Sequence, residues 1–201
     1  MATPMRSSPL ALTVLALLHY QPLHPYGIQR LIKQWGKDQV VNVGQRAGLY
    51  RTIERLLGAG LIAVRETGRD QQYPERTVYE VTDEGRATAR SWLLEMLGTP
   101  KQEFPEFPAA LSQLLLLDAP EMLAALERRR ALLATALRAM DEAAAAEAGR
   151  GLPRITMLEG EYLRAVTAAE ADWLDGVVDD LRAGRLTWST EQLHAFAEAQ
   201  E

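Results

Sequence analysis

The sequence has no cysteine among its 201 residues and only three histidines. Without thiols, neither a disulfide framework nor a thiolate metal site can form. The histidines, at positions 19, 24 and 194, are too dispersed to suggest a metal cluster. A glycine-rich phosphate loop, a nucleophile elbow and a paired acid and base motif are also missing from the sequence. We therefore expect no metal, no cofactor and no enzymatic activity.

Long apolar runs are missing too. The longest extends from Leu10 to Leu18 and is interrupted by Thr13. A membrane-spanning helix needs about 20 apolar residues, and the N-terminus lacks the cleavage pattern of a secretory signal peptide. We expect a cytoplasmic protein that does not bind membranes.

The net charge of -5 is unevenly distributed. Residues 1–98 hold 12 basic and 9 acidic residues, a net of +3, and residues 99–201 hold 10 basic and 18 acidic residues, a net of -8. A basic N-terminal half can approach DNA, whereas an acidic C-terminal half stays off DNA and suits oligomerisation or sensing. Chance asymmetry remains the alternative explanation.

Periodic patterns in the N-terminal half predict three helices and a hairpin. Apolar residues recur at helical spacing over about residues 9–20, 26–35 and 45–57. In the third helix, the residues expected on the buried face are Leu49, Ile53, Leu56 and Leu57. Two alternating segments, 61–66 and 77–81, then predict strands joined by a polar arm at 68–76. This order is that of a winged helix-turn-helix.

A fourth helix, from Asp83 to about Leu97, follows Thr82, which can cap it. The segment 98–108 contains three prolines and is the best candidate for a linker. We therefore expect a DNA-binding domain at residues 1–98 and a second domain at residues 99–201.

The second half has no strand-like segment. We expect helices at Ala109–Leu117, from the Asp118 cap through the alanines at 143–146, at Arg154–Ala183 and at Ser189–Ala199. The predicted fold class is thus mainly α, with an N-terminal winged helix-turn-helix, a two-stranded wing and an all-helical C-terminal dimerisation domain.

The two long C-terminal helices carry apolar stripes that are longer than a single short domain needs for its own core. One side of each helix can pack on the other helix, and a two-fold partner can cover the rest. A self-contained helical bundle in a monomer is the alternative. The residues expected at a homodimer interface are Leu126, Leu133, Leu137, Leu158, Tyr162, Val166 and Trp173.

Three stretches carry a resemblance to a known family. They are LTVLALLHYQPLHPYGIQRLI, GLYRTIERLLGAGLI and RTVYEVTDEGRATARSWL, within about Leu10 to Leu97. Their order and spacing resemble the PadR family of bacterial transcriptional regulators. The resemblance implies a homodimer that binds an inverted-repeat operator, usually as a repressor released by a small effector. The second half resembles longer family members only in its helical pattern.

The resemblance implies roles for two tyrosines. Tyr26, at the start of the second helix, would lie against phosphate, and Tyr50, of the Leu-Tyr pair, would meet the DNA backbone or a base edge. Where the family usually has Gly-Ser or Gly-Thr before this pair, the chain has Ala47 and Gly48, which lack the hydroxyl that could bind phosphate.

Basic residues accompany these tyrosines. Arg51 and Arg55 follow Tyr50 on the outer side of the third helix, and Gln45 and Arg46 are placed at its N-terminus to reach base edges. In the wing, we expect phosphate contacts from Arg69, Gln71, Gln72 and Arg76, opposed by two acidic residues. A solvated helix face is the alternative for the arginines.

Two further questions are left open by the sequence. One alternative is a winged-helix module that binds protein and has lost DNA binding. It would also explain the absence of a hydroxyl at position 48 and the presence of both basic and acidic residues in the wing. A small hydrophobic or aromatic effector could stack on tryptophan, although packing explains tryptophans equally well. The tryptophans concerned are Trp35, Trp92, Trp173 and Trp188.

Overall fold

The computed structural model describes residues 5–44, 46–68 and 76–189, without the side chains of residues 46, 67, 68 and 76. The chain forms two compact units, Met1–Gln102 and Glu103–Glu201. No helix in the described part of the chain is both long enough and apolar enough to cross a membrane.

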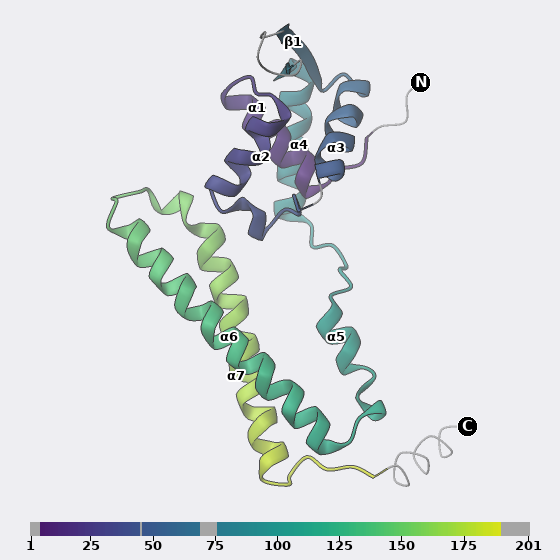
Figure 1. The fold of residues 1–201 in the computed structure, drawn as a ribbon, viewed down its shortest axis with the longest axis vertical. Coiled ribbons are helices and arrows are strands. Elements are labelled where there is room, and N and C mark those ends of the chain that lie inside the picture. The colour runs from purple at the N-terminus through teal and green to yellow at the C-terminus, as the bar shows by residue number, and fades with distance from the viewer. Residues whose placement is uncertain (1–4, 45, 69–75, 190–201) are drawn as a thin grey trace, which may run out of the picture. The chain divides into compact units, whose positions relative to one another are not determined.

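The first unit has the predicted order of elements (Figure 1). They are α1 (Pro9–Tyr20), α2 (Pro25–Gln34), the 3-10 turn η1 (Lys37–Gln39), α3 (Arg46–Gly58), β1 (Ile62–Gly68), β2 (Arg76–Val81) and α4 (Asp83–Gly98). Three helices are followed by an antiparallel hairpin and a fourth helix. The predicted winged helix-turn-helix fold is confirmed.

Side-chain caps fix where three of these helices begin. The Ser8 hydroxyl accepts a hydrogen bond from the Ala11 amide at 3.2 Å, and the Thr82 hydroxyl accepts one from the Gly85 amide at 3.0 Å. At α2, Nδ1 of His24 accepts the Gly27 amide at 2.8 Å. Each cap satisfies an amide that has no partner within the helix. The helices therefore start at positions that the local sequence specifies.

The core of the first unit lies between α1, α2, α3 and the hairpin. Its largest fully buried side chains are Val14, Leu15, Leu18, Ile28, Ile32, Leu49, Ile53, Leu56 and Ile62. The expectation that Leu57 is buried is wrong, since its side chain is 38% exposed. Leu57 lies at the edge of the apolar face of α3, about 80° from Leu49 around the helix.

The outer edge of β2 is hydrogen-bonded to the turn that precedes α2. Tyr79 of β2 pairs with Val64 of β1 and also forms an isolated antiparallel bridge with Leu23. The amide of each bridge residue donates to the carbonyl of the other, at 3.0 and 2.9 Å. The turn before α2 therefore holds the wing at a fixed place relative to the helices.

The described residues of the second unit form helices and 3-10 turns, joined by loops, and no strand. The unit contains α5 (Glu106–Leu111), the 3-10 turn η2 (Leu114–Leu116), α6 (Ala119–Ala148), the 3-10 turn η3 (Arg154–Thr156) and α7 (Leu158–Arg182). A capping box joins Asp118 and Glu121 at the start of α6, as the sequence indicated. The predicted fold class of helices alone after the winged helix is confirmed.

Two predicted helices have different bounds. The helix expected at Ala109–Leu117 is wrong, because α5 starts earlier, at Glu106, and ends at Leu111. Pro108 fits within its first turn, where the missing amide costs no intrahelical bond. The helix expected from Arg154 is a 3-10 turn up to Thr156, and α7 begins at Leu158. The helix expected at Ser189–Ala199 falls, from residue 190 on, outside the described residues.

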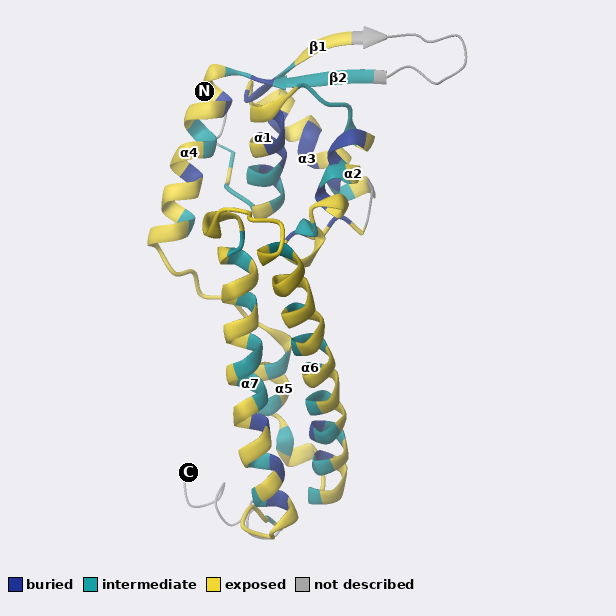
Figure 2. Ribbon diagram, turned by 90° about the vertical axis from the view of Figure 1, so that its left-hand side faces the viewer, coloured by how far each residue is buried: buried dark blue, intermediate teal, exposed yellow. Residues whose placement is uncertain are grey.

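The long helices α6 and α7 pack side by side and run antiparallel (Figures 1 and 2). Their buried contacts gather toward one end of the pair, around Met122 and Leu126 of α6 and Leu174, Val178 and Leu181 of α7. Much of the remaining surface of both helices is exposed, as Figure 2 shows.

Candidate nucleic-acid interface

The helix α3 has one buried face and one exposed face. Leu49, Ile53 and Leu56 are buried against the core. Thr52 is buried beside them, and its hydroxyl donates to the Gly48 carbonyl at 2.9 Å, so this polar group is satisfied inside the helix. The apolar spacing therefore fixes which side of α3 faces solvent.

Tyr50 and Arg51 lie on the exposed side of α3. The Tyr50 side chain is 50% exposed, and Arg51 is exposed. Nε of Arg51 donates to the Ala47 carbonyl one turn earlier, at 3.2 Å. This bond holds the guanidinium toward the N-terminal end of α3. Both residues face solvent, about 100° apart around the helix, and they offer a hydroxyl and a positive charge.

Arg55 lies on a different flank of α3 from Tyr50. Five residues correspond to a rotation of about 140° around a helix. Arg55 lines a groove of about 790 Å³ together with Arg6, Leu61, Glu84 and Trp92, between α3, α4 and the segment before α1. Arg51 and Arg55 are only about 40° apart around the helix. The structure therefore leaves Tyr50, Arg51 and Arg55 all exposed, and Arg55 also lies at the border of the groove.

Tyr26 lies in the first turn of α2, with 62% of its side chain exposed. Its ring stacks on that of the capping His24, with ring centres 6.0 Å apart. The His24 cap and the stacked rings together restrict the positions that the Tyr26 hydroxyl can occupy. Tyr26 is thus an exposed hydroxyl at the start of a helix whose amide dipoles favour anions.

Two basic residues on α2 were missed by the sequence reasoning. Arg30 and Lys33 are exposed and share a face with Tyr26, at spacings of four and seven residues. That spacing was the signal that could have identified them. Together the three side chains give α2 a cationic, hydroxyl-bearing edge, which is the chemistry that contacts phosphate oxygens.

Several predicted site residues cannot be placed. Gln45, Arg69, Gln71 and Gln72 lie outside the described residues, and Arg46 and Arg76 are described only as the first residues of α3 and β2. In the described part of the wing, the strand register shifts between Val64 and Glu66. Arg65, at this bulge, pairs with Glu80 at 3.9 Å, and both side chains are about half exposed.

The residues predicted at a dimer interface have unequal exposure. Leu126 is 5% exposed and packs inside the unit's own core, and Leu133 is half-buried against that core. Leu137 is also half-buried. The exposed members all belong to α7 and share one face of it: Leu158, Tyr162, Val166 and Trp173.

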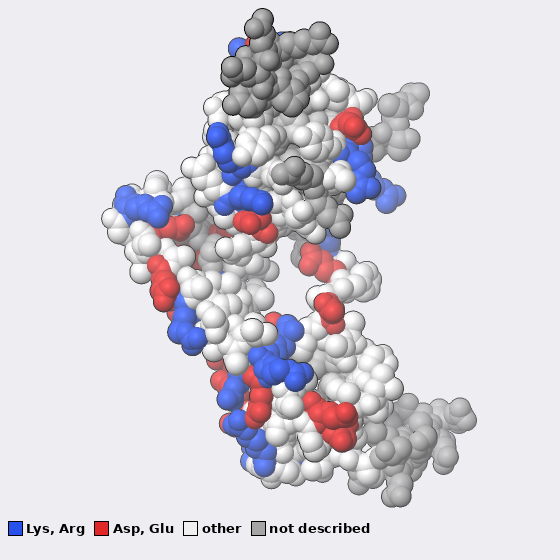
Figure 3. Space-filling view, viewed as in Figure 1, with Lys and Arg blue, Asp and Glu red and all other residues white. Residues whose placement is uncertain are grey.

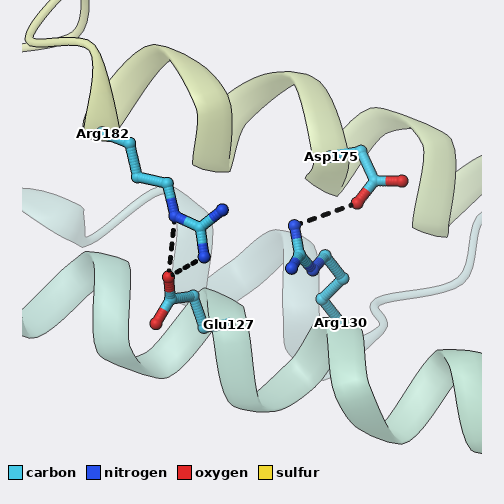
Figure 4. A network of polar contacts seen from close by, with 4 residues as sticks. All are labelled: Glu127, Arg130, Asp175 and Arg182. Carbon is cyan, nitrogen blue, oxygen red and sulfur yellow. Dashed lines mark hydrogen bonds and ion pairs between the residues drawn. The ribbon is translucent and has the colours of Figure 1, made fainter.

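Ion pairs join α6 to α7 on a side of α7 away from this stripe. Figure 4 shows Arg182 donating to Glu127 and Arg130 donating to Asp175, at 2.6 and 3.3 Å. On the face seen in Figure 3, basic and acidic side chains lie next to each other along the two helices. These charges are engaged within the unit, so they do not make it a cationic surface for DNA.

Arg164 of α7 forms a further ion pair with Asp141 of α6. The hydrogen bond from this guanidinium lowers the pKa of the Asp141 carboxyl, and the bond from Arg154 lowers the pKa of Glu161 in the same way. Both pairs are exposed, so solvent screens them.

The four tryptophans have different surroundings. Trp92 is buried in the core of the first unit, and Trp35 is about half exposed. Trp173 meets the Phe107 ring edge-on at 6.1 Å. The indole nitrogen of Trp188 donates to the Leu117 carbonyl at 3.2 Å. Three of the four thus have packing or hydrogen-bonding roles within their own unit.

The first unit, with three helices, a hairpin and an exposed face on the third helix, is a winged helix-turn-helix. Residues 14–91 match the family model described as the transcriptional regulator PadR-like family. The match lies within the winged-helix unit, in the part of the chain where the sequence resembles this family.

Solved structures with a similar fold cover most of the chain. Bacillus subtilis PadR in complex with operator DNA is 18% identical, with a TM-score of 0.71 over 87% of this chain and 99% of that chain. The same protein in complex with p-coumaric acid is 16% identical, with a TM-score of 0.69 over 86% and 98%. The Vibrio cholerae virulence activator AphA is 19% identical, with a TM-score of 0.62 over 87% and 98%. No curated protein matches the sequence.

Proposed function

We propose that this protein is a transcriptional regulator that binds an inverted-repeat operator as a homodimer. The observation that carries the proposal is the solvent-facing side of α3 in a winged-helix unit, where Tyr50 and Arg51 are both exposed. An α-helix of this kind enters the major groove, and its outward side chains meet base edges. The complex of Bacillus subtilis PadR with operator DNA supports this use of the fold.

Phosphate contacts would come from the edge of α2. Tyr26, Arg30 and Lys33 are exposed on that edge. In helix-turn-helix proteins the helix before the recognition helix crosses the DNA backbone. The wing residues Arg69, Gln71, Gln72 and Arg76 stay proposals for the same role. So do Gln45 and Arg46 for base contacts and Arg55 for phosphate.

The homodimer would form through the exposed stripe on α7. Leu158, Tyr162, Val166 and Trp173 offer apolar surface that α6 does not cover. A two-fold partner that covers this stripe would remove it from water and present two copies of α3 to two half-sites. Leu133 and Leu137 can join this interface at its edge, whereas Leu126 supports it from within the unit.

Repression and release by a small aromatic or hydrophobic effector complete the proposal. Bacillus subtilis PadR is known in complexes with operator DNA and with p-coumaric acid, which supports effector release. AphA is described as an activator, so the direction of regulation needs its own test. A reporter driven by the protein's own upstream region, with and without the gene, measures that direction. Higher expression without the gene supports repression, and lower expression contradicts it.

The test of the proposal is a mobility-shift titration of the full-length protein on its own upstream DNA. Binding should weaken steeply as salt rises, because cations released from phosphates drive it. A winged-helix module that binds only protein would give no such shift.

A further inference from the structure

We propose that Arg51 reads a guanine in each operator half-site, through a guanidinium that its own helix holds in position. This inference rests on the proposed function, because it requires α3 to enter the major groove. It goes further by assigning the base and the atoms that are recognised. The ligand is duplex DNA that presents guanine N7 and O6 to the N-terminal half of α3.

The Arg51 side chain is anchored to its own helix. Nε of Arg51 donates to the Ala47 carbonyl at 3.2 Å. Because Nε is occupied, the two terminal nitrogens remain as the donors that can reach outward. They form a planar fork, whose spacing fits two acceptors side by side. The bond to Ala47 also removes part of the rotational freedom that an exposed arginine would lose on binding.

The surface beside the Arg51 side chain includes two small residues. Ala47 is exposed, and a Cβ placed on Gly48 would meet no atom within 4 Å. The side chains at both positions are thus small, a methyl group at 47 and a hydrogen at 48, and the space beside Gly48 is open. The backbone of this turn can therefore come close to the floor of the groove. Ala47 and Gly48 thus leave room beside the Arg51 side chain.

Within the described part of the chain, Arg51 has no acidic partner that would compete with DNA for its guanidinium. No carboxylate among the described residues forms an ion pair with Arg51, whereas most arginines of the second unit have such a partner. An unpaired, anchored fork on an outward helix face matches guanine, which presents the N7 and O6 acceptors together in the major groove. Phosphate contact alone would need neither the anchor nor the small neighbours.

The test is a cycle of protein and DNA changes, after footprinting of the operator. Each guanine of a half-site is replaced in turn by 7-deazaguanine, which lacks N7, in both half-sites at once. Affinities are measured for the wild type, Arg51→Lys, Arg51→Ala and the control Arg30→Ala. Circular dichroism establishes that each variant is folded.

We expect one guanine per half-site at which the loss of N7 weakens the wild type. Changing that G·C pair to A·T should weaken it by about 5- to 150-fold. Arg51→Ala should be insensitive to either change there, and Arg51→Lys should respond less than the wild type, since it keeps the charge but lacks the planar fork. Arg30→Ala should bind more weakly to every sequence and keep the full response at that guanine.

Two results would overturn the inference. One is a wild type that protects a specific operator but responds to no guanine replacement. The other is Arg51→Ala with the same response as the wild type at each guanine. Both results would leave the proposed function standing, because specific binding would persist. A folded dimeric wild type that binds no DNA would remove the proposed function and this inference together.

Discussion

The Cβ that an alanine would add at position 85 would lie 1.9 Å from the carbonyl oxygen of Leu61. Gly85, in the first turn of α4, is therefore pressed directly against the backbone at the start of the wing. Thr82 reinforces this junction, since its hydroxyl donates to the Gly60 carbonyl at 2.8 Å. The start of α4 and the end of the turn after α3 are thus held together by backbone contact. Only glycine permits this distance.

Gly85→Ala should destabilise the protein by about 3 kcal/mol or more, because backbone atoms have to move to relieve the clash. The free energy of unfolding from a urea titration measures this. Gly58→Ala, at the end of α3 in the same unit, is the matched control, since nothing lies within 4 Å of its added Cβ. That change should alter stability by no more than about 1 kcal/mol. Equal effects of the two substitutions would contradict the close packing.

His24→Ala should cost about 1 kcal/mol, because the Gly27 amide loses its acceptor at the start of α2. His24→Asn should recover most of this loss, since asparagine also caps helices. Thermal unfolding of both variants, followed by circular dichroism, measures the difference. If asparagine and alanine destabilise equally, the ring stack on Tyr26 matters more than the cap.

The pKa of the Asp141 carboxyl should lie below that of an ordinary aspartate, because Arg164 donates a hydrogen bond to its ionised form. A lowered pKa in the folded state means that the pair stabilises the fold above the ordinary pKa, and that this contribution disappears as pH falls through the lowered value. Carbon-detected NMR titration of the carboxyl measures it. Arg164→Ala should raise this pKa to its ordinary range, and Arg154→Ala, which removes a pair with Glu161, should leave it unchanged. The opposite pattern would contradict the pairing.

Tyr162→Glu should convert the proposed dimer to monomers, because a charge would have to be buried in the apolar stripe of α7. Light scattering coupled to size exclusion measures the molecular mass. Asp179→Lys, on another exposed side of the same helix, makes a larger change in charge and should leave the dimer intact. A dimer that survives Tyr162→Glu would rule out the stripe as its interface.

The sequence predicted the fold of the first unit well because its signals are local. The spacing of Leu49, Ile53 and Leu56 sets the orientation of α3, and the Thr82 cap sets the start of α4. The bridge between Leu23 and Tyr79 could not be predicted, since it joins segments far apart in the chain that have no matching pattern. The predicted start of the helix near Pro108 was wrong because proline indicates two things. It usually ends a helix, but it is also accepted in a first helical turn.

The candidate site was predicted less completely than the fold. Helical periodicity put Arg51 and Arg55 on one outward side, but a neighbouring helix, α4, turns the surroundings of Arg55 into a groove. The anchoring of Arg51 by the Ala47 carbonyl depends on a side-chain conformation that spacing does not specify. Leu126 has the pattern of an interface residue, yet the pairing of α6 with α7 buries it within one chain.

We propose that α3 and the edge of α2 bind operator DNA, and a mobility shift on the protein's own upstream region over a range of salt concentrations tests this directly. We predict a specific complex at low salt whose affinity falls steeply as salt rises, because contacts to phosphates release counterions. Light scattering of the same sample tests whether the protein is a dimer. A dimeric, folded protein that gives no shift at low salt would contradict the claim.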